Sequence, residues 1–152
     1  MLLFFSFAVV QGKSQQQGFD RSALYTVIES GNKSDIDAQL SIVKGSLLPE
    51  KEAYEGTLLM KKAGLVAKAK DKLNLFKSGR SKLESSISKD GNNTEYRFLR
   101  LIIQEHAPKI VKYRNDMEED SKLIHTNFKS LSPFLQQQII DYSKKSKVLK
   151  TP

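Results

Sequence analysis

Apolar residues recur every three or four positions along most of the chain between residues 20 and 142. This spacing places them on one side of an α-helix, where they can be buried together. No stretch combines alternating apolar and polar residues with β-branched enrichment between turn signals, so the sequence predicts no strand. We therefore expect an all-α fold: a bundle, or a short stack of antiparallel helix pairs, with about six or seven helices.

Start and stop signals divide this pattern into segments. The Ser132-Pro133 pair is the clearest helix start, because serine can cap the helix and proline fits its first turn. Glycine-containing pairs such as Gly31-Asn32 are predicted to end helices in the left-handed conformation. The expected helices span residues 20–30, 34–45, 49–63, 68–89, 93–107, 115–128 and 132–142. The fifth has the densest apolar pattern and is predicted to be the central, most buried helix, whereas the basic tail 144–152 is predicted to fray.

The first ten residues, MLLFFSFAVV, form an uninterrupted apolar run. Its length is typical of the core of a secretory signal and too short to cross a bilayer as a helix. Val10 and Gly12 would provide the small residues of a cleavage site, so the sequence predicts a signal peptide over 1–12, export to the periplasm or the medium, and a disordered stretch over 13–19. The alternative is a buried N-terminal strand or helix. The rest, 20–143, is predicted to be a single helical domain.

The composition excludes several classes of site. The chain has no cysteine, which rules out disulfides, thiolate zinc sites and a cysteine nucleophile. Its two histidines, His106 and His125, have no second ligand at metal-binding spacing. The acids of the run 116–120 are interpreted as the start of a helix, where the dipole favours them, rather than as a calcium loop. No catalytic residue, metal or cofactor is predicted.

Two arginines belong to the predicted central helix. Arg97 and Arg100 flank its apolar run, and the sequence predicts that they pair with a carboxylate such as Glu84 or Glu105. The alternative is that they point into a ligand groove. The tyrosines 54, 96, 113 and 142 are expected to pack between helices with their hydroxyls at the rim.

Positive charge is concentrated in one segment. The chain has 25 Lys and Arg against 17 Asp and Glu, a net charge of +8. Between residues 61 and 82 only Asp71 is acidic, so this segment is predicted to attract anions such as lipid head groups or envelope polysaccharide. Nucleic acid is disfavoured, because the segment lacks aromatic side chains interleaved for base stacking. The alternative is a solvated helix face. The candidate anion-binding residues are Lys61, Lys62, Lys68, Lys70, Lys72, Lys77, Arg80 and Lys82.

One segment resembles a known repeat. The stretch from Leu83 to Tyr96, LESSISKDGNNTEY, is similar to the junction between tetratricopeptide repeats, in which a helix ends in a turn and the next helix opens with an aromatic residue. Gly91 stands where that family usually has proline. Gly79, Leu83 and Ser86 have the spacing of its small, large and small positions, and this implies a close approach of neighbouring helices at Gly79.

The chain as a whole also resembles a group of small exported bacterial proteins of uncharacterised function. The segments AYEG (53–56), MKKAGL (60–65) and EYRFLRL (95–101) carry this resemblance, which implies export and a helical fold. From these observations we expect a non-catalytic exported module that binds a protein partner or an anionic envelope component. The alternatives are a structural domain of an envelope assembly, or an enzyme with a Glu-, Lys- or Tyr-based site. The sequence does not predict an oligomeric state.

Overall fold

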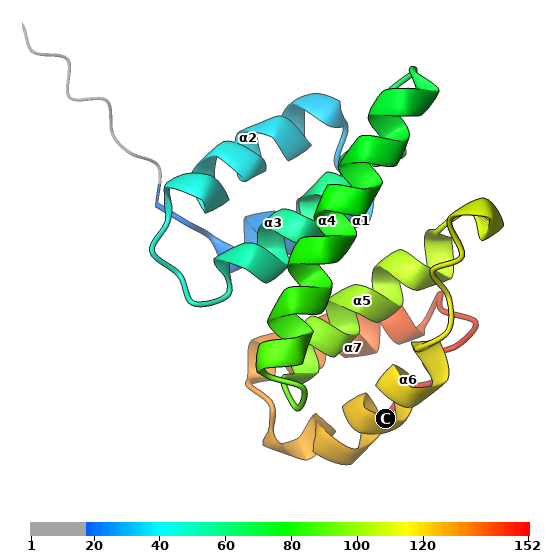
Figure 1. Cartoon of the computed structure of the whole chain (residues 1–152). Coiled ribbons are helices and arrows are strands. Elements are labelled where there is room, and N and C mark those ends of the chain that lie inside the picture. The colour runs from blue at the N-terminus through cyan, green and yellow to red at the C-terminus, as the bar shows by residue number, and fades with distance from the viewer. Residues whose placement is uncertain (1–17) are drawn as a thin grey trace, which may run out of the picture.

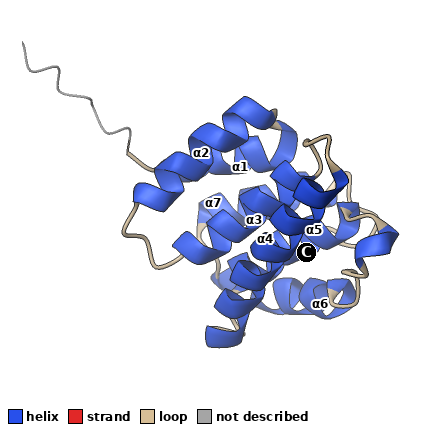
Figure 2. Cartoon of the chain, turned by 45° about the horizontal axis from the view of Figure 1, so that its top comes forward, coloured by secondary structure: helices blue, strands red, loops and turns tan. Residues whose placement is uncertain are grey.

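A computed structural model describes residues 18–152 and confirms the all-α prediction (Figures 1 and 2). This part of the chain contains seven α-helices, two short 3-10 helices and no strand. The α-helices are α1 (Arg21–Ser30), α2 (Lys33–Gly45), α3 (Lys51–Ala63), α4 (Ala69–Lys89), α5 (Thr94–His106), α6 (Met117–Asn127) and α7 (Pro133–Ser143). The 3-10 helices are η1 (Lys109–Val111) and η2 (Phe128–Ser130). None of the helices in residues 18–152 is long and apolar enough to cross a membrane.

Side-chain caps fix the starts of four helices. Asp20, Asn93 and Ser132 each accept a hydrogen bond from a backbone N–H in the first turn of the helix that follows, and the cap at Ser132 was predicted. Helix α2 starts earlier than expected because Asn32 caps it and Ser34 lies inside the helix.

The glycine at the end of α1 acts differently from the prediction. Gly31 has φ −64°, and no glycine of the described residues has a positive φ, so the left-handed ending is wrong. A Cβ atom at Gly31 would lie 2.5 Å from the carbonyl oxygen of Val27. Glycine is therefore required here by a close approach to the preceding turn.

Helix α5 is the central helix, as predicted from its apolar density. It crosses the middle of the bundle, with α3 and α4 on one side and α6 and α7 on the other (Figure 1). Phe98, Leu99, Leu101, Ile102 and Ile103 are all buried. Burying side chains of this size contributes about 1.5–3 kcal/mol each, so α5 supplies a large part of the apolar core.

Helices α3 and α4 meet at two glycines. A Cβ atom added at Gly56 would lie 2.6 Å from the carbonyl oxygen of Gly79, and one added at Gly79 would lie 2.5 Å from that of Gly56. Such distances are shorter than any real carbon–oxygen contact, so the two backbones touch because neither residue has a side chain. This contact agrees with the close approach that the repeat-like spacing implied at Gly79.

The two ends of the described chain are attached to the bundle. Phe19 stacks on Tyr54 with ring centroids 5.4 Å apart. In the segment predicted to fray, Leu149 is fully buried and the backbone N–H of Lys147 donates to Glu105, 2.6 Å away. The tail therefore packs on the bundle, because one apolar side chain and a carboxylate anchor it. The predicted signal peptide (1–12) and most of the stretch 13–19 lie outside the described residues.

Candidate functional site

The structure divides the eight predicted anion-binding residues into three groups. Two of the cations, Lys62 and Lys82, form ion pairs. A further two, Lys61 and Arg80, pack against the bundle and have no acidic partner within residues 18–152. The remaining four are exposed on, or just before, the first half of α4: Lys68, Lys70, Lys72 and Lys77. They have no ion pair within residues 18–152, and we refer to them as the basic arm.

The basic arm lies where α4 leaves the bundle. The N-terminal end of this long helix extends beyond the neighbouring helices at the top of Figure 1. Leu73 lies at helical spacing from the buried Phe76 but is 46% exposed, and Leu65 just before the helix is 48% exposed. Lys70 and Lys77 are three and four residues from Leu73, so they flank it on the same helix face. The result is a leucine surrounded by lysines on a projecting surface.

The paired cations hold helices together. Lys62 of α3 contacts Asp37 of α2 at 2.6 Å. Lys82 of α4 contacts Glu52 at 2.9 Å and Glu55 at 3.4 Å, both on α3. Lys62 and Lys82 therefore connect neighbouring helices, and carboxylates balance their charges.

Arg80 packs against an aromatic ring. Its guanidinium carbon lies 4.5 Å from the ring centroid of Tyr113, a cation–π distance. Tyr113 also packs edge-on against Phe76, and its hydroxyl donates to Glu84. Burial, with the nearby Glu84, raises the pKa of Tyr113. Its hydroxyl is thus inside the structure, not at the rim as predicted.

Lys61 lines a pocket. Its side chain is half-buried, and it has no hydrogen bond or ion pair in the described part of the chain. Burial lowers the pKa of Lys61, because the ammonium group loses water without gaining a carboxylate. This environment differs from that of the exposed basic arm.

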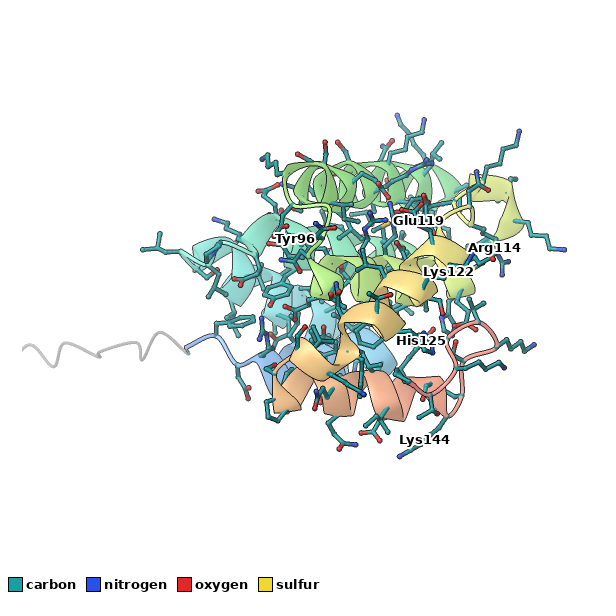
Figure 3. All side chains as sticks on the ribbon, turned by 90° about the horizontal axis from the view of Figure 1, so that it is seen from below. Tyr96, Arg114, Glu119, Lys122, His125 and Lys144 are labelled. Atoms are coloured by element: carbon teal, nitrogen blue, oxygen red, sulfur yellow. The ribbon has the colours of Figure 1, made fainter. Side chains whose placement is uncertain are left out.

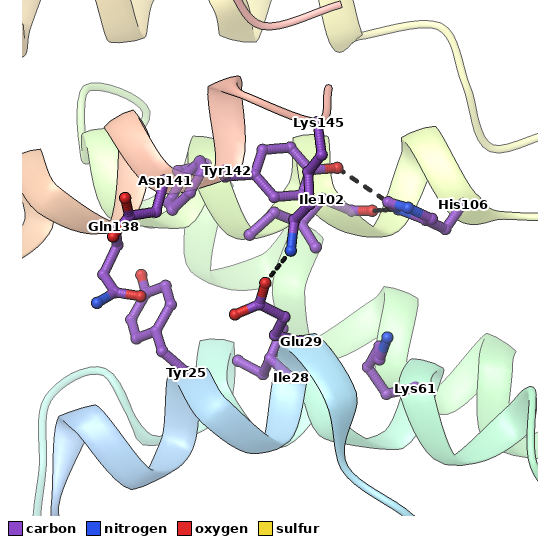
Figure 4. A pocket seen from close by; sticks show the side chains of 11 residues that line it. Tyr25, Ile28, Glu29, Lys61, Ile102, His106, Gln138, Asp141, Tyr142 and Lys145 are labelled. Carbon is purple, nitrogen blue, oxygen red and sulfur yellow. Dashed lines mark hydrogen bonds and ion pairs between the residues drawn. The ribbon is translucent and has the colours of Figure 1, made fainter. Parts of the chain in front are cut away.

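The pocket has a volume of about 160 Å³ and lies among α1, α3, α5 and the end of α7 (Figure 4). Glu29 of α1 and Lys145 form an ion pair beside it. The Nδ1–H of His106 donates to the carbonyl oxygen of Ile102 at 2.9 Å, so only the other ring nitrogen is available to a ligand. The lining is completed by Tyr25, Ile28, Phe98, Gln138, Asp141 and Tyr142.

Arg97 and Arg100 are used structurally, as predicted. Arg100 is buried and contacts Glu84 at 3.1 Å, which confirms one of the two expected partners. The stronger partner was missed: Asp120 is fully buried and accepts from Arg100 at 2.7 Å and from Arg97 at 2.9 Å. The other expected partner, Glu105, instead accepts from Tyr142, Ser146 and the N–H of Lys147.

A second buried polar cluster joins α1, α3 and α5. Glu95 accepts hydrogen bonds from Arg21 at 2.7 Å, from Tyr25 at 3.0 Å and from Tyr54 at 3.2 Å. Burial raises the pKa of Glu95, although Arg21 and the two hydroxyls oppose this shift. This cluster was not predicted from the sequence. A carboxylate in the first turn of the helix predicted to be the most buried was the available signal.

His125 and Lys122 lie on the outer side of α6 (Figure 3). They line a wide depression of about 410 Å³ together with Val148. Both histidines are exposed, and His125 Nδ1 donates to the carbonyl oxygen of Ser121. Within residues 18–152, no group of three or more His, Asp or Glu side chains is placed to hold a metal ion.

Comparison with known protein families, curated proteins and solved structures finds no match to this chain.

Proposed function

We propose that this protein is a non-catalytic module that binds the anionic surface of a lipid membrane through the basic arm. The observation that carries the proposal is the basic arm itself: four exposed lysines, without acidic partners among residues 18–152, on a projecting half-helix around the exposed Leu73. The proposal takes residues 1–12 as an export signal, so that the membrane would be met from the envelope side.

Electrostatics supplies most of the expected affinity. A lysine close to an anionic membrane surface contributes about 1 kcal/mol, so four lysines contribute about 4 kcal/mol, or roughly a thousandfold enrichment at the surface. Such binding is reversible and weakens as salt screens the charges.

The exposed leucines favour lipid over polysaccharide. Leu73 and Leu65 are each about half exposed, at 46% and 48%. A leucine side chain gains up to about 1.5–3 kcal/mol when it leaves water for an apolar phase, and a bilayer offers such a phase beneath its head groups. A sulfated or uronic polysaccharide offers charge alone. The pairing of lysine with leucine therefore fits a lipid surface better.

Several buried ionisable groups form hydrogen bonds with other side chains of the protein, and this supports a non-catalytic function. Glu95 and Asp120 each accept hydrogen bonds from arginine, and Tyr113 donates to Glu84. Groups held in this way stabilise helix contacts.

The test is sedimentation of the protein with phosphatidylcholine vesicles that contain or lack phosphatidylglycerol, at low and at high salt. A variant with all four lysines of the basic arm replaced by glutamine should lose almost all binding to the anionic vesicles. The matched control carries the same loss of charge at exposed lysines elsewhere, Lys122, Lys129, Lys147 and Lys150. This control should retain most of the binding, and an equal loss in both variants would disprove a localised site.

Leu73→Ser separates lipid from other polyanions. We expect the substitution to weaken vesicle binding by about tenfold, from the lost apolar contact, while binding to dextran sulfate stays unchanged. The lipid proposal is wrong if Leu73→Ser weakens binding to vesicles and to dextran sulfate equally. It is also wrong if the protein binds dextran sulfate and does not bind anionic vesicles, because the partner is then a charged polymer.

A further inference from the structure

The pocket beside Lys61 has the dimensions of a small-molecule site. Its volume is about 160 Å³, and a cavity of about 150 Å³ is known to accommodate benzene. Drug-sized ligands need roughly 300–1,000 Å³, so nucleotides and cofactors are too large. An occupant would have a body comparable to one six-membered ring or a short alkyl chain.

Five of the eleven residues that line the pocket are aromatic or aliphatic, and together they form its apolar wall. Tyr25 and Ile28 come from α1, Phe98 and Ile102 from α5, and Tyr142 from α7. Most of these side chains also belong to the buried core, so packing on several helices holds them in place. A wall of this kind favours an apolar ligand body without requiring a large rearrangement.

The charged groups around the pocket leave one positive charge unmatched. Glu29 and Lys145 neutralise each other, and Asp141 contacts Lys144 at 2.7 Å. Lys61 has no hydrogen bond or ion pair within residues 18–152, although it is half-buried. Figure 4 shows Lys61 on the α3 side of the pocket, facing the end of α5 that carries His106.

We propose that this pocket binds a small monocarboxylate with an apolar body, and that the Lys61 ammonium is its counter-charge. A single carboxylate balances the unmatched charge, and the apolar body replaces water against the aromatic wall. Desolvation of Lys61 already lowers its pKa. An anion that binds beside this ammonium group therefore stabilises it more than it would stabilise an exposed lysine. A neutral ligand of the same shape would leave this charge uncompensated.

The pocket is independent of the proposed membrane site. It uses Lys61 and none of the four lysines of the basic arm, so either proposal can fail alone. Substitution of the basic arm should leave ligand binding unchanged, and substitution of Lys61 should leave vesicle binding unchanged.

The experiment is a nuclear magnetic resonance titration of the protein with benzoate, hexanoate and the neutral benzamide. We expect saturable shifts at Phe98, Ile102 and Tyr142 with at least one carboxylate, and at least tenfold weaker binding of benzamide. Lys61→Met should weaken carboxylate binding at least tenfold, whereas the control Lys72→Met should not change it. Lys61→Arg keeps the charge and should retain measurable binding, which distinguishes charge loss from damage to the fold.

Three results would overturn the proposal. The first is the absence of saturable shifts with both carboxylates in the wild-type protein. The second is benzamide binding as tightly as benzoate. The third is unchanged benzoate affinity in a folded Lys61→Met variant, with folding checked by circular dichroism.

Discussion

The two halves of α4 carry the same charges and have different environments. The first half (69–78) and the second half (79–89) each contain three cations and one acid. In the second half, Lys82 pairs with acids of α3 and Glu84 pairs with Arg100. In the first half, none of the lysines has an ion pair within the described residues. Local charge composition therefore does not decide whether a basic segment is structural or free to bind a partner.

The difference arises from what lies opposite each half. The second half faces α3 and α5, which present Glu52, Glu55 and Arg100 to it. The first half extends beyond these helices (Figure 1). We therefore expect substitutions of Lys82, Glu84 or their partners to lower stability, and substitutions of the exposed lysines in the first half to weaken binding alone.

The largest expected loss of stability follows substitution of Arg100, the ion-pair partner of Glu84. Arg100→Met leaves Asp120 buried with only Arg97 to balance it, and breaking a buried ion pair from one side costs about 3–5 kcal/mol. Urea denaturation should show a loss of this size. Lys77→Met removes the same charge from the first half of α4 and should change the free energy of unfolding by less than about 0.5 kcal/mol. Equal losses would remove the distinction between the halves.

The next effect is at the helix crossing. Gly79→Ala would put a Cβ atom 2.5 Å from the Gly56 carbonyl oxygen, which forces the helices apart. Overpacking of this kind costs about 1–3 kcal/mol, more than the gain of up to about 1 kcal/mol from better helix propensity. Thermal denaturation should show a lower midpoint than wild type. The adjacent exposed Ser78→Ala should leave the midpoint unchanged or slightly raised, and a stabilised Gly79→Ala would show that the crossing is looser than described.

The smallest effect concerns pH. Burial, with Glu84 nearby, raises the folded-state pKa of Tyr113 above the unfolded value of about 10. The stabilisation from its protonated hydroxyl is therefore complete below about pH 10 and is lost as pH rises above it, by at most about 1.4 kcal/mol per pH unit. Urea denaturation between about pH 9 and pH 11 should show a shallower decline in Tyr113→Phe than in wild type. If stability falls with the same slope in both proteins, the Tyr113 hydroxyl does not make the buried contact with Glu84 of α4.

Local signals predicted much of the fold. Asn93 and Ser132 begin helices where expected, because a cap acts on N–H groups two or three residues away and can be recognised in the sequence. The apolar density of α5 likewise identified the central helix. Leu73 shows the limit of this reasoning: its spacing places it on the face of Phe76, but spacing does not reveal where the neighbouring helices end.

The candidate site was less predictable, because pairing depends on remote residues. Charge counting found all eight cations, but Asp37 and Glu52, which neutralise Lys62 and Lys82, come from other helices. Asp120 lies in the first turn of α6, as predicted, but its burial against Arg100 was not predicted. The pocket around Lys61 combines residues from distant segments, and no local motif signals it.

The contact between Gly56 and Gly79 also limits how the sequence can vary. The atoms that meet there belong to the main chain, which is the same for every amino acid. A harmful side chain at either position therefore cannot be suppressed by a smaller residue at the other, since both are already the smallest. A genetic search for suppressors of Gly79 substitutions should yield reversion, or changes that shift the whole helix pair, such as at Met60, and no direct size exchange across the crossing.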